Sequence, residues 1–173
     1  ERAGGRTYLE IAKEGGGILR TVADTRATSN EAMVSRALRF IEKMRALGVT
    51  TIECKSGYGL TVEDEIRLLE VYRDIASEQP VRIVATLLGA HTLPPEYKDD
   101  RKAYIKLVIE EMIPRTAAEG LATFCDVFVE DSAFTPDEAR GILNAAREHG
   151  LGIRLHADQL SEGGGAALAA EVG

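Results

Sequence analysis

The stretch "LGIRLHADQLSEGGG", residues 151–165, carries the pattern on which the fold prediction depends. A short apolar run ends on His156, and an acid and an amide, Asp158 and Gln159, follow directly. Three glycines then lead into an alanine-rich segment that has the composition of a helix. The stretch therefore predicts a strand, a loop with reactive side chains and a helix, in that order.

The same order recurs along the chain. Apolar runs predict strands at about residues 49–54, 81–88, 123–129 and 152–156. Apolar residues at three- and four-residue steps predict helices at about residues 30–47, from residue 61, at 101–119, at 136–149 and from residue 164. Pro114 is expected to kink the third of these helices or to divide it. The chain thus consists of four strand–helix units preceded by a helix.

Apolar strands that alternate with amphipathic helices indicate a parallel sheet covered by helices. Two architectures fit this pattern, an open doubly wound sheet and part of a (β/α)8 barrel. Polar residues follow every strand, and we expect function at one switch point in an open sheet but around the whole mouth in a barrel. The sequence therefore favours an α/β fold that is a partial (β/α)8 TIM-type barrel, with about half of the roughly 250 residues of a full barrel.

Composition excludes several classes of function. The chain has 173 residues and a net charge of −7, with both signs mixed and no basic stripe, so we expect no nucleic-acid partner. It has no apolar run long enough to span a membrane and no signal peptide, which predicts a soluble cytoplasmic protein without a membrane partner. Cys54 and Cys125 lie far apart in apolar runs and are interpreted as buried free thiols.

Four residues that follow strands are candidates for chemistry, and each has a structural alternative. His156 is a candidate metal ligand, or a histidine bonded to a backbone carbonyl. Gln159 can donate and accept hydrogen bonds, which suits an amide-like ring, or it caps a loop. His91, between a glycine-containing turn and two prolines, could polarise a carbonyl or carry a proton, or bond locally. Tyr58 could contact a small ring, or fold back on the following helix.

Two further residues have mainly structural interpretations. Lys55 follows the first strand and is expected to pair with Glu53, Glu130 or another carboxylate at the mouth. His149 lies in the last turn of a predicted helix, where a cation suits the helix dipole, and is expected on the surface.

Four stretches resemble the imidazolonepropionase family of the amidohydrolase superfamily: "IECKSGYGL", "LLGAHTLPPEY", "DVFVED" and "LHADQLSEGGGAALA". The resemblance extends over essentially the whole chain. It implies a distorted (β/α)8 barrel with a small β-sandwich. It also implies hydrolysis of the ring C–N bond of 4-imidazolone-5-propanoate to N-formimidoyl-L-glutamate in histidine degradation. One divalent metal, zinc or iron, would activate the water.

The resemblance also implies a role for each candidate. His156 corresponds to a metal ligand at the end of the fifth barrel strand. Tyr58 and His91 correspond to substrate-binding residues, with His91 close to the ring carbonyl, where a neutral histidine would hydrogen-bond the developing oxyanion. Gln159 corresponds to a residue that contacts the substrate or the metal-bound water, so His91 and Gln159 are the implied catalytic residues. As an amide, Gln159 cannot act as a carboxylate base.

The departures from the family pattern are equally informative. The family's His-x-His ligand pair has no counterpart, since the only histidines are His91, His149 and His156. The remaining ligands and a substrate-binding arginine are expected outside the chain. We therefore interpret residues 1–173 as strands two to five of the parent barrel with the preceding connection, both parent ends missing, and expect this segment alone to be inactive.

One alternative is a non-catalytic half-barrel module that binds a small ligand or self-assembles. For the parent enzyme, the expected partners are the small-molecule substrate and, in a homodimer, a second copy. A half-barrel leaves two strand edges and, we expect, an apolar sheet face uncovered.

Overall fold

A computed structural model describes residue 5 and residues 17–173. The first part of the predicted connection, residues 1–4 and 6–16, lies outside the described residues. The strands are β1 (Thr51–Lys55), β2 (Arg82–Ala90), β3 (Phe124–Val129) and β4 (Gly152–Ala157). The main helices are α2 (Ile18–Ala27), α3 (Asn30–Ala46), α4 (Val62–Glu78), α5 (Arg101–Leu107), α6 (Ile113–Ala118), α7 (Pro136–Glu148) and α8 (Gly165–Val172).

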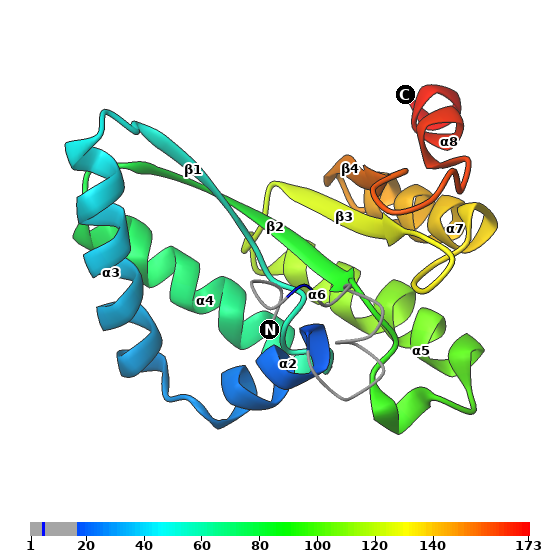
Figure 1. Ribbon diagram of the computed structural model, residues 1–173, viewed down its shortest axis with the longest axis horizontal. Helices are drawn as coiled ribbons and strands as arrows, with labels where there is room; N and C mark the ends of the chain where they lie inside the picture. The colour runs from blue at the N-terminus through cyan, green and yellow to red at the C-terminus, as the bar shows by residue number, and fades with distance from the viewer. Residues whose placement is uncertain (1–4, 6–16) are drawn as a thin grey trace.

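The four strands form one parallel sheet in the order β1-β2-β3-β4. Each strand therefore lies beside the next one in the sequence, whereas a doubly wound sheet reverses its order at a switch point. Figure 1 shows the strands fanned in this order, with α3 and α4 beside β1 and β2, and α7 and α8 beside β3 and β4. The sheet curls as half of a barrel, which confirms the predicted fold class.

Alternate residues of the strands form the core beneath the helices. Leu87 of β2 and Val127 of β3 are fully buried in the same apolar cluster as Ile66 of α4 and Ile142 of α7. Burying each of these side chains contributes about 1.5–3 kcal/mol. This packing fixes the strands and thereby the position of the loops at their carboxyl ends.

The predicted helix starts are confirmed by their caps. The hydroxyl of Ser29 accepts from the backbone of α3, and that of Thr61 accepts from the N–H of Asp64 at 3.0 Å. Thr135 and Glu138 form a complete capping box at the start of α7. Each cap satisfies a backbone donor that the helix itself leaves without a partner.

The helix predicted at 101–119 is divided, as Pro114 led us to expect. A π-helical segment, Val108–Met112, separates α5 from α6, and the N–H of Ile113 donates to the carbonyl of Val108. Proline has no N–H to continue the regular ladder. One wider turn before Pro114 allows the helix to continue in the same direction.

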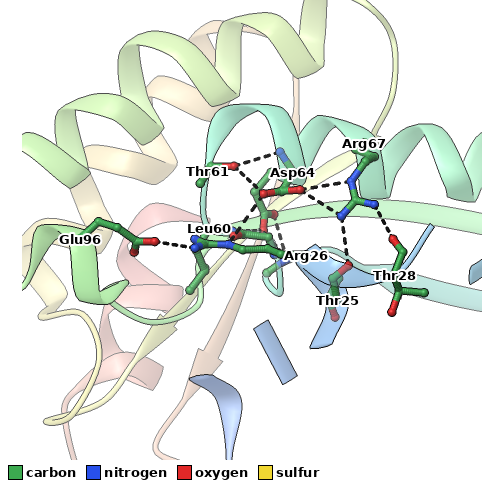
Figure 2. Close-up of polar contacts among 11 residues, drawn as sticks. Thr25, Arg26, Thr28, Leu60, Thr61, Asp64, Arg67 and Glu96 are labelled. Carbon is green, nitrogen blue, oxygen red and sulfur yellow. Dashed lines mark hydrogen bonds and ion pairs between the residues drawn. The ribbon is translucent and has the colours of Figure 1, made fainter. Parts of the chain in front are cut away.

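Helix α2 was not predicted, and of its ten residues only Val22 is buried. Arginines hold it in place (Figure 2). Arg26 donates to the carbonyl of Gly59 at 2.7 Å and to Glu96 at 2.5 Å. Arg67 of α4 donates to carbonyls at the end of α2. Such long-range tertiary contacts leave no periodic signal in the sequence.

Candidate active site

A cavity of about 490 Å³ opens where the carboxyl ends of the strands meet. Its lining brings together all four residues singled out from the sequence, Tyr58, His91, His156 and Gln159. The other lining residues are Ile18, Phe128 and Leu160. Hollows beside α3 are lined by residues of the α3 and α4 surfaces and contain no histidine. The strand-end cavity is therefore the candidate site.

Tyr58 lies on the loop after β1, which a buried carboxylate organises. Glu65 of α4 is fully buried and accepts hydrogen bonds from the N–H groups of Gly57, Gly59 and Leu60, each with a contact of 2.8 Å. Leu60 adopts a left-handed backbone with φ 58°. Three backbone N–H groups of the loop thus donate to one side chain rather than to a neighbouring strand, and the periodicity of the sequence does not predict this role for Glu65.

His91 lies at the end of β2 between two aromatic rings. Its ring centroid is 5.0 Å from that of Tyr58 and 5.9 Å from that of Phe128, both in edge-on arrangements. Its Nδ1 lies 2.9 Å from the carbonyl oxygen of Gly57. Burial lowers the pKa of His91, which favours the neutral ring. The residue therefore has a local partner and also faces the cavity.

His156 ends β4 and lies close to a buried acid of β3. Its Nδ1 is 3.0 Å from Oδ2 of Asp126, whose side chain is 2 % exposed. Burial raises the pKa of Asp126, but His156 and Lys55 more than offset this effect, so the pKa lies below its usual value. The two atoms are close, but Nδ1 of His156 makes no hydrogen bond of regular geometry among the described residues. A carboxylate on this edge of the ring leaves Nε2 for another ligand, and metal-binding histidines commonly have such a carboxylate neighbour.

The sheet face opposite the helices carries a row of charges. Lys55 contacts both Glu53 and Asp126 at 2.7 Å, and Arg154 contacts Glu53 at the same distance. Lys55 thus has the predicted ion-pair role. The expectation of an apolar uncovered face is wrong, because the ion pairs of Glu53, Lys55, Asp126 and Arg154 lie on this face. This face therefore gives an apolar association no support.

Two carboxylates shape the loop that carries Gln159. Glu130 accepts from the N–H of Leu160 at 2.6 Å and from the hydroxyl of Ser161 at 2.6 Å. Asp158, in a left-handed conformation, accepts from three N–H groups at the start of α8. Asp158 thus caps the start of α8. The next residue, Gln159, is exposed and lines the cavity.

The described residues contain no group of three or more His, Cys, Asp or Glu side chains placed to hold a metal ion. A catalytic metal uses about three protein ligands. His156, with a carboxylate at Nδ1, fits the role of one such ligand.

Several contributors to the site were missed from the sequence. Asp126 and Arg154 are polar residues within otherwise apolar strands, and this exception was the signal that could have identified them. Phe128 and Glu65 gave no such signal, because an aromatic residue in a strand and an acid in a helix are common.

His149 lies exposed at the end of α7, as predicted.

Comparison with known proteins gives a consistent result. The chain is 54% identical over 169 residues to the imidazolonepropionase of Myxococcus xanthus, covering 98% of the chain and 40% of that protein. It is 51% identical over 172 residues to the imidazolonepropionase of Geobacillus thermodenitrificans, covering 99% and 41%. For that of Ectopseudomonas mendocina the identity is 51% over 173 residues, covering 100% and 43%.

The chain is similar to imidazolonepropionases over nearly its whole length. It spans about two fifths of the length of these imidazolonepropionases. No family model matches the chain. Among the described helices, none is long and apolar enough to cross a membrane.

Proposed function

We propose that this chain is strands two to five of an imidazolonepropionase barrel, and that it supplies part of the active site. The reaction is metal-dependent hydrolysis of the ring C–N bond of 4-imidazolone-5-propanoate, which gives N-formimidoyl-L-glutamate in histidine degradation. One observation carries the proposal: Tyr58, His91, His156 and Gln159 line a single cavity at the carboxyl ends of parallel strands. In α/β barrels this end of the sheet is where catalysis occurs.

The side chains have distinct roles in this proposal. Tyr58 and His91 bind the ring of the substrate, because both rings are held at the cavity by the loop that Glu65 organises. Gln159 donates and accepts hydrogen bonds to the substrate amide. Because Gln159 cannot take up a proton, it orients the substrate or the water and does not act as the base.

His156 is the one metal ligand that this chain provides in the proposal, through Nε2. Asp126 lies 3.0 Å from Nδ1 on the other edge of the ring, where a carboxylate commonly orients a metal-binding histidine. A bound zinc or iron ion lowers the pKa of water toward neutrality and polarises the substrate carbonyl. The remaining ligands come from outside residues 1–173, and the enzyme acts in the cytoplasm.

A chimera tests the proposal directly. The matching segment of the Myxococcus xanthus imidazolonepropionase is replaced by this chain, and loss of 4-imidazolone-5-propanoate is followed. We expect turnover in the chimera, because the missing strands and ligands are supplied. We expect His156→Asn to lower kcat/KM by at least about a thousandfold and to lower the bound metal content, as removal of a metal ligand does.

The matched control is His149→Asn, which changes an exposed histidine seven residues away and should leave kcat/KM unchanged. A folded, metal-loaded chimera without turnover would contradict the proposed function. Full turnover in the His156→Asn chimera would contradict the role of His156.

A further inference from the structure

Nδ1 of His91 has one hydrogen-bonding partner, the backbone carbonyl of Gly57. Nδ1 lies 2.9 Å from the carbonyl oxygen of Gly57, and a carbonyl oxygen accepts but cannot donate a hydrogen bond. The proton of a neutral imidazole must therefore be on Nδ1. Nε2, at the opposite edge of the ring, then has a lone pair and no hydrogen.

From this geometry we infer that His91 presents an unprotonated Nε2 to the cavity, and that Glu65 is the positioning residue that sets this state. The neutral ring accepts a hydrogen bond from the N–H of a cyclic amide and does not donate one to the carbonyl. This inference rests on the proposed function for the identity of the ring. It revises the expectation that a neutral His91 hydrogen-bonds a developing oxyanion.

The carbonyl of Gly57 can hold His91 because its own peptide is held. Glu65 receives the N–H of Gly57 at 2.8 Å and 3.1 Å on its two carboxylate oxygens, and the N–H groups of Gly59 and Leu60 as well. Glu65 is fully buried, so these bonds do not exchange with water. The charged acceptor makes each bond stronger than one between neutral groups.

The rings on either side restrict His91 in the remaining directions. The Tyr58 and Phe128 rings approach it edge-on at centroid distances of 5.0 Å and 5.9 Å. A flip of the imidazole would place a carbon against the carbonyl of Gly57 and lose the hydrogen bond. The ring orientation and the tautomer are therefore set together, before any ligand binds.

The consequence for recognition is a requirement on the ligand. A cyclic amide offers an N–H beside its carbonyl, and the carbonyl is then free for other donors or for the metal. A ring whose nitrogens are all methylated leaves Nε2 of His91 without a donor, and an unpaired buried acceptor opposes binding.

The tautomer can be measured without metal or substrate. A long-range ¹H–¹⁵N NMR spectrum of the ¹⁵N-labelled 173-residue chain at pH 8 resolves the nitrogens of only three histidines. His149→Asn and His91→Asn variants assign them. We expect Nδ1 of His91 to have the chemical shift of a protonated nitrogen and Nε2 that of a bare one. The reverse pattern, which free histidine favours, would overturn the inference.

The role of Glu65 has its own measurement. In the wild-type chain we expect slow hydrogen exchange at the amides of Gly57, Gly59 and Leu60, although they lie in a loop. In Glu65→Gln we expect exchange at least about tenfold faster and a mixture of His91 tautomers. Glu63→Gln, an exposed acid in the first turn of the same helix, is the matched control and should change neither.

If Glu65→Gln does not fold, the exchange rates of the wild-type chain test the role of Glu65. Fast exchange at the amides of Gly57, Gly59 and Leu60 would refute the hydrogen bonds to Glu65 on which the inference rests. Unchanged His91 shifts in a folded Glu65→Gln variant would refute the positioning role. None of these measurements depends on turnover, so their failure is distinct from failure of the proposed function.

Discussion

At the scale of single residues, the candidate site depends on acids that do not touch the cavity. Glu65 holds the loop of Tyr58, Glu130 holds the loop of Gln159, and Asp126 lies against His156. Each of these acids accepts from backbone N–H groups or lies beside a ring nitrogen. Side chains at the strand ends are thus fixed by residues behind them, as precise binding requires.

Gly57 allows a prediction with a matched control. Gly57 and Gly48 have nearly equal positive φ angles, 91° and 90°. A Cβ on Gly57 would lie 2.8 Å from the carbonyl oxygen of Leu88, whereas a Cβ on Gly48 would meet nothing within 4 Å. We expect Gly48→Ala to cost about 1–2 kcal/mol for its backbone conformation alone.

Gly57→Ala should cost about 2–4 kcal/mol in total, because steric overlap adds to the same backbone cost. Urea unfolding of both variants measures the difference. Equal losses of unfolding free energy would show that the loop moves aside without cost, which would weaken the argument for a rigid Tyr58 loop.

The residue scale also shows what the sequence could predict. Lys55, His91 and His156 stood out because charged or polar groups followed apolar runs. Their partners could not be predicted, since Asp126 is 71 residues from Lys55 and only the strand register brings the two together. Glu65 was indistinguishable from the other acids of its helix until its burial was known.

At the scale of elements, helix α7 is joined to α5 by one bidentate pair. Arg101 donates from Nε and from a terminal nitrogen to the two carboxylate oxygens of Glu138, at 2.6 Å and 2.8 Å. Glu138 also completes the capping box with Thr135. The same side chain therefore starts one helix and connects it to another.

The pair predicts a pH dependence of stability. The hydrogen bond with Arg101 lowers the pKa of Glu138 below the usual 4.5. A lowered folded-state pKa contributes stability above 4.5 that is lost as the pH falls through the folded value. We expect Glu138→Gln to cost about 1 kcal/mol at pH 7. The difference from wild type should become smaller as the pH is lowered from 7 to 3, because Glu138 then takes up a proton.

Thermal unfolding at both pH values tests this, with Asp137→Asn as the control, because Asp137 is an exposed acid of the same first turn. A loss of stability in Glu138→Gln that stays constant down to pH 3 would show that the helix cap and not the ion pair is responsible.

The boundaries of most helices and strands were well predicted from caps and periodicity. Helix α2 was the exception, because arginine contacts stabilise it.

At the scale of the whole molecule, the chain carries a half of a barrel and one candidate metal ligand. We expect the purified 173-residue chain to show no turnover of 4-imidazolone-5-propanoate. We also expect no stoichiometric zinc binding at micromolar concentration, because a single histidine cannot complete a site.

Titration calorimetry and a turnover assay check these expectations, and the chimera serves as the positive control. Tight one-to-one zinc binding by the isolated chain would mean that other residues complete the site.

The overall fold was predictable because the spacing of apolar residues and the capping and turn residues indicate the same boundaries in every strand–helix unit. The charges on the sheet face opposite the helices were not predictable, because the sequence alone did not show which residues of each strand lie on that face.

The sheet places its strands in the same order as the chain does. Each described strand therefore leaves the ribosome directly after its sheet neighbour, with only the connecting helical segments between them. Among the strands that the structure describes, none has to be inserted between two others, and each one extends the edge formed by the strand before it. Each step still closes a long connection, since Thr51 pairs with Arg82 and Phe124 with Gly152, and parallel pairings of this kind form slowly compared with local helical contacts.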